Sequence, residues 1–285
     1  MLLSIASDST YNGLNAASIQ IYLLEGDEDS QSCQQLLDTC YLPKTVPNVA
    51  KQVDMLHNTY HRTYGPGYNY GTYLLKSGCN LVMQLSKTRA FLPFLLDENG
   101  IGVKKVNTTA LLLNIITDFV DESTNGVFGG GKEDDISPSY CVRALLNLSF
   151  PPDDSKLQVP EYLSQIFPSH INITEVMEKY IRNPLITKTK WRQARADALL
   201  LISRTRQAFA VKKDLTEEER DEIQECIDWT NGHVVVLLQN SSKNDKRIQY
   251  DGRCHTSLEW EEEAKMEHKN LSRFINQVKL DGCLL

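Results

Sequence analysis

One stretch of the chain concentrates side chains whose chemistry is anion binding. Between Lys179 and Lys213 the sequence has ten lysines and arginines against a single acid, Asp197, which gives a net charge of +9. The whole chain carries −7, so the residues outside this stretch carry −16. Guanidinium and ammonium groups bind phosphate and carboxylate, and a local excess of them in an acidic protein predicts an anion-attracting surface.

Helical spacing gathers part of this charge on one face. At 100° per residue, four cations of a helix expected over 187–211 and one just beyond its end fall within about 60° of one another: Lys188, Arg192, Arg195, Arg206 and Lys213. The adjoining and opposite arc is largely apolar, which predicts an amphipathic helix with one buried face and one cationic face. A solvated helix face that binds no partner is the alternative interpretation, because lysine and arginine are common on such faces.

Tyrosines interleaved with glycines form a second candidate binding segment over 60–73. Tyr68 and Tyr70 lie at its centre, where exposed aromatic rings would stack on bases or contact a partner. The alternative interpretation is a rigid turn between two helices whose tyrosines pack on the core, and the sequence favours this one.

Two histidines have the spacing of metal ligands. His57 and His61 lie four residues apart on an expected helix, so that both imidazoles face the same side, with Asp54 one turn earlier. The intervening residues lack the glutamate that a zinc hydrolase helix places after its first histidine. Surface or packing histidines are the favoured interpretation, and we expect no metal and no cofactor.

The elements that must position these residues are mainly helical, because apolar residues recur with a period near 3.6. We expect helices over 30–41, 46–63, 69–86, 88–97, 107–122, 137–149, 173–183, 187–211, 216–230 and 257–280. Two short segments, 18–24 and 234–238, are rich enough in β-branched residues to form minor strands. The predicted fold class is therefore all-α or nearly so.

Several of these helices have recognisable end signals. Thr216 and Glu219 have the spacing of a capping box. Ser137 followed by Pro138 places an expected cap and a first-turn proline ahead of the next helix, and Gly282 is placed to end the last one.

Prolines and acids at 151–156 predict a break between two helical lobes, 1–150 and 157–285, with the basic helix in the second. A single continuous domain is the alternative. Apolar runs at 110–119 and 142–148 are typical of buried helices, which fits an armadillo/HEAT-like stack or a two-lobed helical bundle.

Cysteine usage and hydropathy bear on the compartment. The seven cysteines form no Cys-x-x-Cys pair, which is typical of reduced thiols in the cytoplasm or, alternatively, the nucleus. No apolar run approaches about 18 residues and the first residues lack a basic leader, so we expect neither a membrane partner nor a signal peptide.

These features favour function by binding over catalysis. The leading hypothesis is a non-enzymatic interaction or scaffold protein whose cationic helix docks an acidic or phosphorylated protein surface, with oligomerisation left open. The first alternative is an RNA-binding nucleoprotein, with the basic helix lining a groove that holds single-stranded RNA. The second is a metal-dependent enzyme that uses His57 and His61.

Overall fold

The structure is a computed structural model of the 285-residue chain. It describes residues 53–54, 56–58, 60, 71–87, 92–96, 107–125, 136–151, 158–167, 172–209, 215–241, 248–250, 253–255 and 257–280. Within these residues no helix has both the length and the apolar character needed to cross a bilayer.

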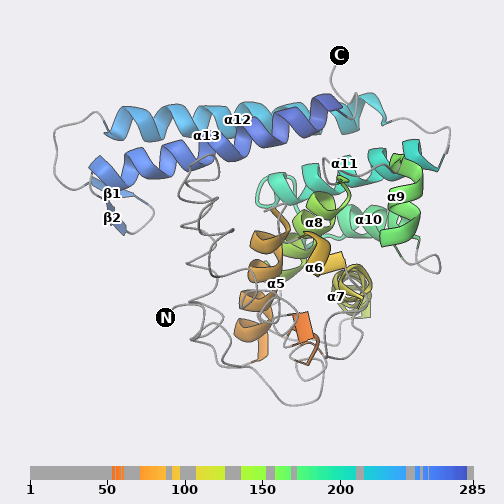
Figure 1. Ribbon diagram of the computed structural model, residues 1–285. Helices are drawn as coiled ribbons and strands as arrows, with labels where there is room; N and C mark the ends of the chain where they lie inside the picture. The colour runs from red at the N-terminus through yellow and green to blue at the C-terminus, as the bar shows by residue number, and fades with distance from the viewer. Residues whose placement is uncertain are drawn as a thin grey trace. The chain divides into compact units, whose positions relative to one another are not determined.

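The prediction of a helical fold is confirmed (Figure 1). The helices are α5 (Gly71–Lys87), α6 (Leu92–Leu96), α7 (Thr108–Asn125), α8 (Ser137–Leu148), α9 (Val159–Ile166), α10 (Ile173–Arg182), α11 (Arg192–Ala208), α12 (Glu217–Ser241) and α13 (Ser257–Leu280). A short antiparallel hairpin, β1 (Ile248–Tyr250) and β2 (Arg253–His255), precedes α13.

The chain divides into two compact units, Met1–Val211 and Lys212–Leu285. The division predicted at 151–156 instead falls within the first unit, because α8 before it packs against α11 after it. Two hydrogen bonds hold the sides together: the Arg204 Nε donates to the Ser149 carbonyl at 3.0 Å, and the Tyr162 hydroxyl donates to the Leu148 carbonyl at 2.8 Å.

Helix α8 lies at the centre of the first unit and contacts α5, α7 and α11 (Figure 1). Its sequence is apolar around most of its circumference, and residues such as Cys141, Val142 and Leu145 are wholly buried. The neighbouring α7 buries Leu112, Ile116 and other aliphatic side chains. The buried helices expected at 110–119 and 142–148 are thus both found. Each is apolar on several faces because each of those faces packs against another helix.

The second unit is built on two long antiparallel helices, α12 and α13, which pack along each other (Figure 1). Buried residues of α12 recur at intervals of three and four: Ile223, Cys226, Ile227, Thr230, Val234 and Leu237. On α13 the corresponding series is Ala264, Leu271, Phe274 and Val278. This spacing is that of a coiled-coil seam, which buries one stripe of each helix.

One local expectation is wrong, and two elements of the structure were not expected. The strand predicted at 234–238 is wrong: these residues continue α12, because Val234 and Leu237 have the three-residue spacing of its buried stripe. Helix α9 and the β1–β2 hairpin were not expected. The strand expected at 18–24 and the helix expected at 30–41 lie outside the described residues.

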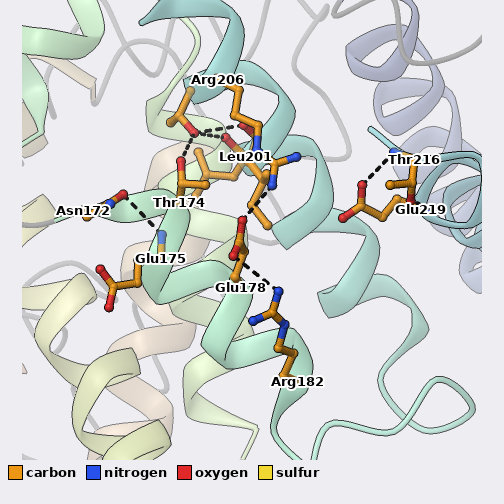
Figure 2. Close-up of polar contacts among 11 residues, drawn as sticks. Asn172, Thr174, Glu175, Glu178, Arg182, Leu201, Arg206, Thr216 and Glu219 are labelled. Carbon is orange, nitrogen blue, oxygen red and sulfur yellow. Dashed lines mark hydrogen bonds and ion pairs between the residues drawn. The ribbon is translucent and has the colours of Figure 1, made fainter. Parts of the chain in front are cut away.

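Helix ends agree with the sequence at one site and differ at another. The Thr216 and Glu219 capping box is confirmed, since each backbone N–H donates to the other residue's side chain, at 2.8 Å and 3.2 Å (Figure 2). At α8 the first-turn proline is confirmed, but Ser137 is already the first helical residue and the N-cap is Ile136, which makes no side-chain cap. Gly282 lies outside the described residues.

Candidate functional site: the basic segment

Helix α11 is buried on every side. All thirteen residues from Ala194 to Arg206 are buried, because the helix packs against α8, α9 and α10. Arg195, Arg204 and Arg206 retain exposed fractions of only 8%, 6% and 4%. The exposed cationic stripe expected on this helix is therefore not formed at Arg195 and Arg206.

The guanidinium of Arg195 faces the protein backbone. Its Nη1 donates to the Ile181 carbonyl at 2.6 Å and to the Ile186 carbonyl at 3.0 Å. Ile181 lies in the last turn of α10 and Ile186 in the loop that follows, so one side chain ties that loop to the start of α11. Such charge-assisted bonds are stronger than neutral ones, and the loop conformation depends on them.

Arg206 is paired with an acid of α10. Its Nη2 donates to the Glu178 Oε1 at 2.7 Å, while Arg182 approaches the other oxygen of the same carboxylate at 3.5 Å (Figure 2). Beside this group the hydroxyls of Thr174 and Thr205 lie 3.2 Å apart, and that of Thr205 donates to the Leu201 carbonyl (Figure 2). These contacts join α10 to α11 and use the Arg206 charge within the fold.

The third buried arginine, Arg204, links α11 to the end of α8. Besides its bond to the Ser149 carbonyl, its guanidinium carbon lies 3.9 Å from the centre of the Phe150 ring, within cation–π range. Near it, burial raises the pKa of the Tyr162 phenol to about 12, and the positive charge of Arg204 only partly opposes this shift. Burial at this position therefore favours the neutral form of the Tyr162 phenol.

Asp197, the single acid of the basic segment, is the centre of a buried ion pair. The Arg143 Nε of α8 lies 2.6 Å from its Oδ2, and the Gln193 amide donates to its Oδ1 at 3.0 Å. Burial raises the pKa of the Asp197 carboxyl, and Arg143 and Gln193 oppose that rise. The sequence reasoning missed this pair; the signal available was one acid within an apolar and basic helix, which needs a cation from elsewhere.

The exposed charge of the segment lies on α10, where Lys179 and Arg182 pair with Glu175 and Glu178, and in the α10–α11 loop and the start of α11. Lys188 and Lys190 are exposed and Arg192 is half-buried; we call these three the loop cations. Between Asn183 and Ala196 the sequence has no acid. The loop cations are thus positive side chains, two exposed and one half-buried, in a stretch of sequence that contains no acid.

Trp191 fixes the shape of this loop. Its indole is 8% exposed, its backbone N–H donates to the Thr187 carbonyl at 3.0 Å, and the Lys190 ammonium lies 5.4 Å from the centre of its ring. The buried indole anchors the loop, and the loop cations lie on either side of it in the sequence. The backbone hydrogen bond and the buried indole thus order the stretch of chain that carries the three loop cations.

The other candidate residues are less fully placed. Lys213, Tyr68, Tyr70 and His61 lie outside the described residues, so the tyrosine segment and the histidine pair stay predictions. His57 is half-buried and lies among the helical residues 53–54, 56–58 and 60. In the part of the chain that the structure describes, no three His, Cys, Asp or Glu side chains are grouped so as to hold a metal ion.

The site is thus a cationic loop held by buried arginine and tryptophan side chains, and its chemistry is recognition of negative charge. Comparison with known proteins adds no analogy to this geometry: no protein-family model, no curated protein and no solved structure matches the chain.

Proposed function

We propose that this is a non-enzymatic interaction protein and that the loop cations dock an acidic or phosphorylated surface of a protein partner. The observation that carries the proposal is the exposure of Lys188 and Lys190 beside Arg192 in a stretch without acids. Arginine binds a phosphate or carboxylate through two N–H groups at once, and the lysines add positive charge around it.

The internal contacts support this assignment of the loop. Arg195 donates to both Ile181 and Ile186, and Trp191 is buried, so the loop is held in place before a partner arrives. A site that is already ordered loses less conformational entropy on binding. The remaining helices of the first unit act as the platform, and an armadillo/HEAT-like repeat and a cytoplasmic location stay parts of this proposal.

Charge elsewhere favours a small acidic epitope over an extended nucleic acid. The residues outside 179–213 carry −16, which repels a long polyanion, whereas a phosphorylated side chain needs only a local cluster. Arg195 and Arg206, which the RNA-binding alternative requires, are buried. Single-stranded RNA is therefore the competing outcome of the test.

The test is fluorescence anisotropy with three labelled probes: a phosphoserine peptide rich in acids, the same peptide without phosphate, and single-stranded RNA. The binding variant is Lys188→Glu/Lys190→Glu/Arg192→Glu. We expect the wild type to bind one or both acidic peptides, with an affinity that falls as the salt concentration rises. We expect the variant to bind with an affinity at least tenfold lower, because three attractive charges become repulsive.

A matched control changes the same number of charges on the second unit: Lys269→Glu/Arg273→Glu/Lys279→Glu on α13. This control should bind the peptide within about twofold of the wild type. Equal losses in both variants would reduce the effect to net charge and contradict a local site. Binding of RNA alone would favour the nucleoprotein, and absence of binding to every probe at low salt would overturn the proposal.

A further inference from the structure

Two cysteines from different helices meet in the core of the first unit. The Sγ of Cys79 on α5 and the Sγ of Cys141 on α8 lie 3.5 Å apart, and both residues have an exposed fraction of 0%. Neither side chain is in a disulfide. Cys226, also outside any disulfide, is buried in the second unit.

We propose that Cys79 and Cys141 are a modification site: an oxidisable dithiol that a small peroxide converts to a disulfide joining α5 to α8. A disulfide bond is about 2.05 Å long, so the sulfur atoms must approach by about 1.5 Å from their present separation. Side-chain rotation and a small shift of one helix supply a movement of this size. The α5 and α8 helices pack directly against each other, so the sulfurs start in contact range.

The chemistry balances with hydrogen peroxide as the oxidant. The thiolate of one cysteine attacks a peroxide oxygen, the O–O bond breaks, and a sulfenic acid and hydroxide form. The second thiol attacks the sulfenic sulfur, the S–O bond breaks, and water leaves as the S–S bond forms. Two thiols and one peroxide thus give one disulfide and two waters, and a dithiol reductant reverses the change.

Burial decides which reagents reach the pair. A thiol with an exposed fraction of 0% is closed to bulky reagents. Peroxide is small and uncharged, so it enters through brief openings of the helix packing. The second step needs no external reagent, because the partner sulfur is already adjacent. The pair should therefore oxidise slowly but end as a disulfide, with little accumulation of oxygen adducts.

The consequence is a covalent link between residues 62 positions apart in sequence. Such a link restricts the unfolded chain more than the folded one and stabilises the first unit. We expect the thermal midpoint of that unit to rise by about 5–10 °C on oxidation and to return on reduction.

The test uses the full chain with Cys79 and Cys141 retained and the other five cysteines replaced: Cys33→Ser, Cys40→Ser, Cys226→Ala, Cys254→Ser and Cys283→Ser. After peroxide treatment, alkylation of the unfolded protein and mass spectrometry should show loss of two hydrogen atoms and no alkylated thiol. Reduction should restore two alkylated thiols. Retained thiols, or separate oxygen adducts on the two residues, would overturn the proposal.

Matched variants with one partner removed, Cys79→Ala or Cys141→Ala, should gain oxygen or stay reduced and show no intramolecular link. If the five-fold replacement fails to fold, the same question is put to the wild type. Peptide mapping must then find the fragment containing Cys79 linked to the fragment containing Cys141. A different pairing, or no linked fragment from protein oxidised in the folded state, rejects the proposal.

Discussion

Helix α11 and the loop before it carry the same kind of charge and use it in opposite ways. Arg195 and Arg206 of the helix are buried and donate to protein oxygens, whereas Lys188 and Lys190 of the loop are exposed. Arg192 lies at the junction and is half-buried. A single basic stretch of sequence therefore supplies both buried arginines that hold helices together and lysines that face solvent.

The difference teaches that the number of charges in a segment does not give the charge of a surface. A buried cation is retained only where carbonyls or carboxylates replace the water it has lost. The helix has such partners in the Ile181 and Ile186 carbonyls and in Glu178. Variants of the two regions should consequently differ in kind: interior changes reduce stability, and loop changes alter binding.

The largest effect should come from Arg143→Met. This change leaves the Asp197 carboxylate, whose side chain is 2% exposed, without its cation, and should cost about 3 kcal/mol at neutral pH. Burial holds the folded-state pKa of Asp197 above its unfolded value, so the cost is small below pH about 4 and grows as pH rises. Urea unfolding of variant and wild type at pH 7 and pH 4 measures this.

Asp197→Asn is the matched change at the other partner. It removes the buried charge and leaves Arg143, whose side chain is 18% exposed and partly reaches solvent. The loss should be smaller than for Arg143→Met. It should shrink as pH rises above about 4, because the wild type must then ionise a carboxyl whose folded-state pKa is raised, whereas asparagine carries no charge. A larger loss for Asp197→Asn would show that the arginine, not the acid, is the more costly group to leave alone.

Arg195→Met should follow, with a loss of about 2 kcal/mol, because two carbonyls lose their charged donor. Urea unfolding gives the loss, and hydrogen exchange at 183–191 should become faster as the loop is released. Arg192→Met is the control one turn earlier in the basic stretch and should change stability by less than about 0.5 kcal/mol. Equal losses in the two variants would mean that Arg192 stabilises the fold as much as the buried Arg195 does.

Tyr162→Phe should cost about 1 kcal/mol, because the Leu148 carbonyl loses its donor. Its pH dependence has a definite sign. The folded-state pKa of Tyr162 is about 12 against about 10 unfolded, so the tyrosine stabilises the fold fully below pH 10 and loses this contribution as pH rises to 12. The difference in unfolding free energy between wild type and variant should shrink over that range; a constant difference contradicts the assignment.

The smallest effect on stability should come from the loop itself. Lys188→Glu with Lys190→Glu should change the unfolding free energy by less than about 0.5 kcal/mol, because both side chains are exposed. Circular dichroism during urea unfolding of this double variant and the wild type checks this. A loss above 1 kcal/mol would show that these lysines stabilise the fold, as the buried arginines do.

The sequence largely predicted the helices, one of their caps and the burial of their apolar faces. The period of apolar residues predicted α7, α8 and α13 within a few residues, and the Thr216 and Glu219 capping box is formed as expected. These features depend on residues three or four apart, which the chain itself brings together. The strand predicted at 234–238 failed because a run of β-branched residues has no fixed structure until it meets a partner helix.

The sequence by itself determined that the protein is helical, that it concentrates positive charge in one segment, and where most helices begin and end. Only the tertiary structure decided which of those charges face solvent, that Arg143 of α8 pairs with Asp197 of α11, and that Cys79 and Cys141 meet. The reason is physical: these contacts join residues more than fifty positions apart. Their partners are fixed by how helices pack together, which local spacing does not encode.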